Sequence, residues 1–320
     1  MIDYETDDGV VKAVGDISIN VNAGETLGLV GETGAGKTTT ALGVMRLVPD
    51  PPGRIKSGRI IFEGEDLLNL SPAQMRKIRG KRISMIFQDP MTALNPILTV
   101  GQQIAEGIRN HTNCNRNEAM LAAIDMLEKV GIPAIRSNNY PHQFSGGMKQ
   151  RVVIAMAMAC EPQLLIADEP TTALDVTIQA QMLNMVNDLK REHNTAMLLI
   201  THDLGVVAET CDSVAIMYAG EIMEYGTIQH IFNETGHPYT KGLFNSIPSL
   251  ENRIHRLIPI KGLMPDPMNL PSGCKFHPRC TQCTEQCKHE SPDEIMASKG
   301  HLVKCHYADR GVENGRQHTS

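Results

Sequence analysis

Short apolar runs of strand length recur along the first 235 residues, separated by stretches of helical length. Runs with few polar positions are typical of parallel strands that are buried on both faces. They lie at residues 26–30, 83–87, 164–167, 196–200 and 214–217. We therefore expect an α/β fold with a mainly parallel sheet and helices on both of its faces.

Two further segments predict strands, and one predicts a helix. Residues 14–21 alternate apolar and polar positions, as a half-buried strand does, and residues 59–62 form a short apolar run. Ser71 and Gln74 have the spacing of a capping box, and Pro72 between them suits the first helical position. A helix should therefore follow Ser71.

The middle of the chain lacks strand patterns. Between residues 90 and 141 we expect helices only, and Asn115 should open one that ends before Gly131. This region, about 90–155, is interpreted as a helical subdomain inserted between strands.

The end of the chain is rich in proline and cysteine. From about residue 237, frequent prolines leave little room for regular structure. We therefore expect a main domain over residues 1–235 and an irregular, Cys-rich C-terminal extension over residues 236–320.

A glycine-rich turn follows the apolar run at 26–30 and precedes a helical stretch. Its glycines let successive N–H groups turn toward phosphate oxygens at a helix N-terminus. Lys37 would reach the β- and γ-phosphates, and the Thr38 hydroxyl would bind Mg²⁺. The turn predicts an ATP-type nucleotide site, which would be formed by Gly31, Glu32, Thr33, Gly34, Ala35, Gly36, Lys37, Thr38 and Thr39.

Composition narrows the class of protein. The chain has 320 residues, 41% of them hydrophobic, which is ample for a buried core. Its net charge of -6 at pH 7 gives no basic field, so nucleic acid is not an expected partner. No apolar stretch approaches the roughly 20 residues of a membrane span, and the N-terminus lacks a signal-peptide pattern. A cytoplasmic chain is expected.

Two carboxylates follow the apolar run at 164–167. In a phosphate-loop ATPase, the first such residue, here Asp168, usually meets Mg²⁺. The second, Glu169, can polarise the attacking water as a general base. Paired acids at a strand end are common on surfaces, but downstream of a full phosphate loop they predict catalysis.

A serine and two glycines open another helix, expected over residues 149–159. Ser145 suits the N-cap position, and Gly146 and Gly147 leave the helix end bare and electropositive. Such an end binds phosphate, so this segment predicts a second phosphate contact.

Taken together, these motifs resemble the nucleotide-binding subunits of ATP-binding-cassette (ABC) transporters, which are P-loop NTPases. The matching motifs occur in order: the Walker A loop at 31–38, the Gln88 loop, the signature Ser145-Gly146-Gly147, the Walker B end Asp168-Glu169, the Ala173-Leu174-Asp175 loop and the switch residue His202.

This resemblance implies a role for each matching residue. Glu169 would be the catalytic base, His202 would contact the γ-phosphate, and Gln88 would sense that phosphate and relay to a membrane partner. The Mg²⁺ ligands would be Thr38, Gln88 and Asp168.

The sequence departs from the commonest family pattern in two places. Phe144 and Met148 replace a usual Leu and Gln beside the signature, while Ser145 and both glycines, which carry the phosphate contact, are kept. Tyr4 is the candidate for stacking on adenine, although only three residues precede it and a structural tyrosine fits equally well.

The extension resembles the C-terminal region of oligopeptide, dipeptide and nickel importer ATPases. Residues 236–240 and 273–280 carry this likeness, and residues 86–96 look like the Gln loop of the same group. The resemblance implies short peptides as substrates, with nickel or nickel chelates as a narrower option.

Four cysteines, Cys274, Cys280, Cys287 and Cys305, are spaced as in that group, and Cys283 is an addition. Four thiolates from a loop-rich segment suit a [4Fe-4S] cluster or a structural Zn²⁺ ion. Unligated thiols are the alternative.

The sequence therefore predicts the ATP-hydrolysing subunit of an ABC importer, peripheral at the cytoplasmic face of the cell membrane. Its partners would be a second ABC ATPase subunit, either a related chain or a second copy, two transmembrane permease subunits and, indirectly, an extracytoplasmic solute-binding protein. Two alternatives are a cassette ATPase that serves without a membrane and a regulatory metal-binding protein with a vestigial ATPase. The long coiled-coil insertion or paired cassettes usual in the first are not found, and the intact catalytic set weakens the second.

Overall fold

The structure, a computed structural model, describes residues 1–170, 175–246 and 259–308. The chain forms two compact units. The first unit consists of Met1–Asn20, Leu27–Arg59 and Thr201–Ser320, and the second of Val21–Thr26 and Ile60–Ile200.

A mixed sheet organises the first unit. Strand β10 (Ser213–Tyr218) pairs in parallel with β3 (Thr26–Val30) and antiparallel with β11 (Glu221–Thr227). The order continues from β11 to β13 (His301–Val303) and β12 (Ile295–Ser298). Every residue of β3 and β10 is buried, so the prediction of strands buried on both faces is confirmed here.

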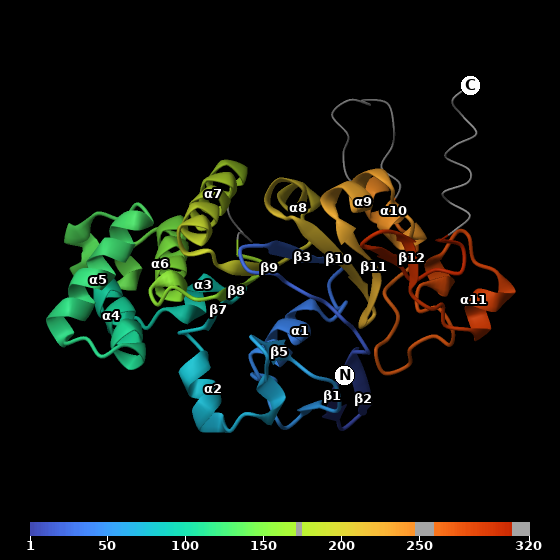
Figure 1. The fold of residues 1–320 in the computed structure, drawn as a ribbon, viewed down its shortest axis with the longest axis horizontal. Helices are drawn as coiled ribbons and strands as arrows, with labels where there is room; N and C mark the ends of the chain where they lie inside the picture. The colour runs from blue at the N-terminus through green and yellow to red at the C-terminus, as the bar shows by residue number, and fades with distance from the viewer. Residues whose placement is uncertain (171–174, 247–258, 309–320) are drawn as a thin grey trace. The chain divides into compact units, whose positions relative to one another are not determined.

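Helices cover both faces of this sheet. Figure 1 shows α8, α9 and α10 on one side and α1 on the other. Their bounds are α1 (Lys37–Val44), α8 (Leu204–Thr210), α9 (Ile228–Asn233) and α10 (Pro238–Asn245). A separate antiparallel sheet has the order β2-β1-β4, with β1 (Ile2–Thr6), β2 (Gly9–Val14) and β4 (Gly53–Ile55).

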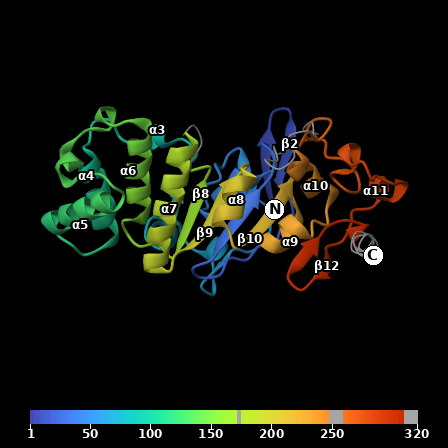
Figure 2. The ribbon, with the colours of Figure 1, turned by 90° about the horizontal axis from the view of Figure 1, so that it is seen from above.

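Three parallel strands organise the second unit. Strand β8 (Leu164–Asp168) lies between β7 (Ile83–Ile86) and β9 (Ala196–Thr201), and both pairings are parallel. The short strands β5 (Ile61–Phe62) and β6 (Glu65–Asp66) form a hairpin. The helices are η1 (Leu67–Asn69), α2 (Pro72–Ile78), α3 (Pro90–Ala93), α4 (Val100–His111), α5 (Arg116–Lys129), η2 (Ala134–Asn138), η3 (Pro141–Gln143), α6 (Gly146–Met158) and α7 (Val176–His193). Figure 2 shows α4, α5, α6 and α7 gathered at one side of this unit.

The expected helix caps are present in the second unit. Ser71 and Gln74 form a reciprocal capping box at the start of α2. Asn115 and Glu118 do the same for α5, and Gly131 lies just beyond the end of α5 with a positive φ of 76°. Local side-chain chemistry thus fixes these helix boundaries.

The strand expected over residues 14–21 is wrong. Strand β2 ends at Val14, and residues 15–25 lie outside any strand. Ile17 and Ile19 are half-buried while Ser18 is exposed, so the alternation describes an extended segment. The Gly15 N–H donates to the carbonyl of Gly220 instead of to a neighbouring strand.

Most of the described extension lies outside helices and strands, as expected, but it also contains short regular elements that the sequence did not predict. Besides α10 it contains η4 (His277–Arg279), α11 (Glu285–His289), β12 and β13. Strand β13 pairs with β11, so the extension continues the main sheet of the first unit. Pro238 is compatible with α10 because it occupies the first turn of that helix, where no N–H is needed.

Among the described residues, we find no helix whose length and hydrophobicity would let it span a bilayer.

Candidate nucleotide site and cysteine cluster

The glycine-rich loop connects β3 to α1 in the first unit. Gly36 is the residue before α1 and has a φ of 104°, which favours glycine. Gly31 is required by space, because a Cβ there would lie 2.1 Å from the carbonyl oxygen of Met217. The loop is also tied to β10's end, since Gly220 donates its N–H to the Ala35 carbonyl at 2.9 Å.

Lys37 is held against this loop. Its Nζ donates to the carbonyl of Gly31 at 2.7 Å and to that of Glu32 at 3.0 Å, and the residue is 6% exposed. Thr38, the next residue, is exposed. The lysine is therefore in place beside the N–H groups that a phosphate would meet at the start of α1.

Two other candidates, His202 and Tyr4, also lie in the first unit. His202 is exposed and follows β9 directly. Tyr4 lies within β1 opposite Gly53, and its ring fills the space that a Cβ on Gly53 would need. Tyr4 thus packs across the β1–β4 pair, and its proposed stacking on adenine stays a prediction.

The two acidic residues lie at the end of β8 in the second unit. Asp168 is the last residue of the strand and is 1% exposed. Glu169 follows with a φ of 47°, which is uncommon for a residue with a side chain. Its N–H donates to the Ile200 carbonyl at 2.9 Å.

The structure brings Gln88 and Glu169 together. Gln88, two residues beyond β7, donates its Nε2 to Oε2 of Glu169 at 3.1 Å. The parallel pairing of β7 with β8 accounts for this contact, because the carboxyl ends of parallel strands lie at the same edge.

The signature residues form an exposed helix start, also in the second unit. Ser145 is the N-cap of α6, and its Oγ accepts the N–H of Met148 at 3.4 Å. Ser145 and Gly146 are exposed, whereas Phe144 is buried. The N-terminal end of α6 is therefore exposed at Ser145 and Gly146, and its positive dipole end favours an anion there.

Ala173 and Leu174 of the third loop motif lie outside the described residues. Asp175 is the residue before α7.

The predicted Mg²⁺ ligands supply a hydroxyl, an amide and a carboxylate. Thr38 belongs to the first unit, and Gln88 and Asp168 belong to the second. Hard oxygen donors of this kind suit Mg²⁺, so the donor chemistry fits the ion.

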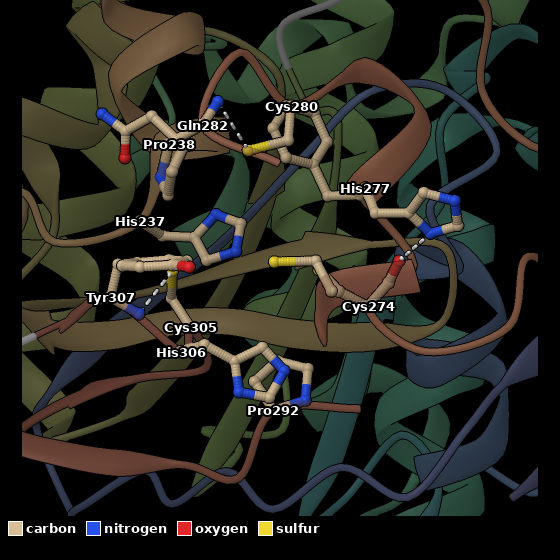
Figure 3. A pocket seen from close by; sticks show the side chains of 12 residues that line it. His237, Pro238, Cys274, His277, Cys280, Gln282, Pro292, Cys305, His306 and Tyr307 are labelled. Atoms are coloured by element: carbon tan, nitrogen blue, oxygen red, sulfur yellow. Dashed lines mark hydrogen bonds between the residues drawn. The ribbon is translucent and has the colours of Figure 1, made fainter. Parts of the chain in front are cut away.

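The four cysteines of the extension line one cavity. Cys274, Cys280, Cys287 and Cys305 all contribute to its wall, and Cys283 does not. Figure 3 shows Cys274, Cys280 and Cys305 arranged around the ring of His237.

Burial favours the protonated form of three of these four thiols. It raises the pKa of Cys274 and of Cys280 to about 11 each, and it also raises the pKa of Cys305. Two backbone N–H groups point at sulfur, from Gln282 to Cys280 and from Tyr307 to Cys305, each at 3.4 Å. In the described part of the chain, no three side chains are placed as a ready ligand set for a metal ion.

Sequence reasoning missed the contacts between the extension and the glycine-rich loop. Arg279 pairs with Glu32, and the Tyr239 hydroxyl accepts the Glu32 N–H. Arg279 and Glu32 are 247 residues apart in the sequence, so no local sequence pattern predicts their contact.

Comparisons with known proteins agree with these motifs. Residues 14–172 match the ABC transporter family, and residues 223–287 match the oligopeptide/dipeptide transporter C-terminal region. The oligopeptide transport ATP-binding protein OppD of Haemophilus influenzae is 50% identical over 94% of this chain and 93% of its own length. The dipeptide transport ATP-binding protein DppD of Bacillus subtilis is 48% identical over 98% of this chain and 94% of its own.

Solved structures show the same fold. A dimeric bacterial ABC transporter cassette aligns with a TM-score of 0.62 and 26% identity, covering 71% of this chain and 99% of that one. The cbiO1 protein of Clostridium perfringens, part of an ABC transporter complex, also aligns with a TM-score of 0.62, at 27% identity over 73% of this chain and 91% of its own. The chain is thus an ABC-type ATPase with a P-loop NTPase fold, and it belongs to the ATP-binding subunits of the oligopeptide and dipeptide ABC transporters.

Proposed function

We propose that this chain hydrolyses ATP at an interface between two cassettes and couples the reaction to the uptake of short peptides. The observation that carries the proposal is the 50% identity to a peptide-transport ATP-binding protein over 94% of the chain. The glycine-rich loop, the exposed signature and the Gln88–Glu169 pair support the same reading, because each supplies a group that ATP hydrolysis needs.

The loop residues Gly31, Glu32, Thr33, Gly34, Ala35, Gly36, Lys37, Thr38 and Thr39 would bind the triphosphate. Lys37 would exchange its loop carbonyls for phosphate oxygens as ATP binds. Bound Mg²⁺, held by Thr38, Gln88 and Asp168, would neutralise charge on the phosphates.

Glu169 would orient and deprotonate the attacking water, while its contact with Gln88 fixes the carboxylate. His202 would contact the γ-phosphate, and Tyr4 would stack on adenine. Catalysis would arise mainly from positioning and charge stabilisation.

The signature residues Ser145, Gly146 and Gly147 would bind the nucleotide of the facing cassette. The exposure of Ser145 and Gly146 at the start of α6 supports this assignment, because a contact with another subunit requires an open surface. Each interface would then hold the loop of one chain and the serine of the other.

The remaining partners would be two transmembrane permeases and a solute-binding protein that delivers the peptide. Closure of the two cassettes on ATP would change the conformation of the permeases. The chain would lie peripherally at the cytoplasmic face of the membrane. The domain boundary near residue 235 is proposed to separate the catalytic cassette from the extension.

Co-purification and reconstitution test this function. The full chain, expressed with its neighbouring subunits, should bring down two hydrophobic permeases that mass spectrometry identifies. In proteoliposomes, short peptides should stimulate ATP hydrolysis and accumulate inside. Stimulation by Ni²⁺ instead of peptides would replace the peptide assignment, and recovery without any membrane subunit would support a non-transport ATPase.

We also propose that the four cysteines of the extension hold a metal centre, a [4Fe-4S] cluster ahead of Zn²⁺. The shared cavity and the two N–H groups directed at sulfur support the proposal, and binding requires the thiols to lose their protons and draw together. A metal centre there would cross-link the extension. Anaerobically purified chain should be coloured and absorb visible light, and a colourless sample with stoichiometric zinc would exclude the iron–sulfur cluster.

A further inference from the structure

Glu32, the second residue of the glycine-rich loop, is held at both its backbone and its side chain by the extension. Its N–H donates to the Tyr239 hydroxyl at 3.0 Å. Its two carboxylate oxygens accept from Nη1 and Nη2 of Arg279 at 2.6 and 3.0 Å. Two parallel hydrogen bonds between a guanidinium and a carboxylate fix geometry as well as charge.

Arg279 is itself immobilised. Its side chain is 5% exposed, and its Nε donates to the Lys261 carbonyl at 3.1 Å. The guanidinium lies 5.7 Å from the ring centre of Tyr218, which packs edge-on against Phe276 of the extension. The bond to Glu32 raises the pKa of Arg279 further, so the cation persists at any physiological pH.

The pair acts next to the proposed phosphate site. Lys37 donates to the carbonyl of the same residue, Glu32, that Arg279 holds through its carboxylate. The position of Glu32 therefore sets one of the two carbonyl groups that hold Lys37, the other being that of Gly31. An unpaired carboxylate at this place would also repel the phosphates of ATP, because both are anions at short range.

We propose that Arg279 is a positioning residue for ATP binding, by which the extension neutralises Glu32 and holds the glycine-rich loop in its binding shape. The inference rests on the proposed ATPase function. It assigns the extension a role at the nucleotide, beyond its own folding.

Substitution of Arg279 tests this role in the full chain. Arg279→Gln should weaken the binding of a fluorescent ATP analogue and raise KM for ATP about tenfold, while kcat changes less than twofold. Arg279→Lys, which keeps the charge but loses the two-pronged geometry, should fall in between. Lys275→Gln is the matched control, because it removes a cation of the same extension that donates to the Pro271 carbonyl.

A second substitution separates charge from general damage. In Glu32→Gln/Arg279→Gln the repelling carboxylate is gone, so the double variant should bind ATP several-fold more tightly than Arg279→Gln alone. If the double variant and Arg279→Gln bound ATP equally weakly, the loss of affinity would come from damage to the fold alone, and the proposal would be overturned. An unchanged KM for ATP in Arg279→Gln would also overturn the proposal. If that variant does not fold, an unchanged KM in Arg279→Lys would do the same.

Wild-type chain provides the reference for both proposals. If it neither binds nor hydrolyses ATP, the ATPase function itself fails. If it does both and the Arg279 variants match it, only the positioning role fails.

Discussion

Gln88 donates its amide to the carboxylate of Glu169 at 3.1 Å, which joins the proposed sensor of the γ-phosphate directly to the proposed base. Glu169→Gln keeps an oxygen that can accept this bond but removes the basic group. We expect the variant to bind ATP and to lose at least about 100-fold in turnover, the usual scale of general-base catalysis. It should also accumulate as an ATP-bound dimer in size-exclusion chromatography.

Glu192→Gln is a suitable control for that experiment. Glu192 pairs with Lys129 at 2.9 Å on the exposed surface of the same unit, so its loss should leave turnover unaffected. Undiminished hydrolysis in Glu169→Gln would remove this residue from the base role.

Ser145 should act on the nucleotide of the facing cassette. If two copies of this chain pair, Ser145→Ala and Lys37→Ala should each be inactive alone and regain activity when mixed. Mixing places an intact Lys37 opposite an intact Ser145 at one of the two sites. If the partner is a related chain, Ser145→Ala should be tested by photolabelling with an azido-ATP. Labelling of the partner's glycine-rich loop should then decrease, while labelling of this chain's own loop should be unchanged.

Gly31 cannot accept a side chain. The Cβ of Gly31→Ala would meet the Met217 carbonyl oxygen at 2.1 Å, so the loop must shift, and ATP affinity should fall more than tenfold. Gly107→Ala is the matched control, because a Cβ in that helix meets nothing within 4 Å. It should leave ATP binding unchanged and stabilise the chain by about 0.5–1 kcal/mol in urea unfolding.

Glu224 should make the first unit sensitive to acid. The residue is buried, which raises its pKa, but hydrogen bonds from His301 at 2.8 Å and from the N–H groups of Gly236 and His237 outweigh burial and lower it below 4.5. Its contribution to the free energy of unfolding is therefore full above pH 4.5 and is lost as pH falls further.

Unfolding curves between pH 3 and 7 check this expectation. Glu224→Gln should be less stable than wild type at pH 7 by several kcal/mol, on the scale of a broken buried pair, and its stability should vary less with pH. Glu221→Gln, which breaks the half-buried pair with Lys304 at 2.8 Å, should cost about 1 kcal/mol or less. Parallel pH profiles in wild type and Glu224→Gln would contradict the assignment.

Local chemistry made much of this structure predictable. The caps at Ser71 and Asn115 act within three residues of the helix that they start, so their sequence signals transfer directly to structure. The apolar run of β8, with Asp168 and Glu169 after it, was predictable for the same reason. The family relationship was readable too, because its motifs occur together and in order.

Non-local pairing was not predictable. The alternation over 14–21 indicated which side chains face inward but not whether a neighbouring strand would pair with them. The strands β12 and β13 were not predicted, because frequent prolines in the extension indicated loops and because β13 depends on the distant strand β11 for its pairing. The Arg279–Glu32 pair likewise depends on the fold that brings the extension to the loop.

The pairing of β13 with β11 has a consequence for any attempt to isolate the cassette. A chain cut near residue 235 would leave the edge of β11 at Glu224 and Tyr225 without its partner strand β13. Such an open edge invites pairing with other chains. Aggregation of the shortened protein would then reflect the loss of a protective strand rather than the loss of nucleotide binding.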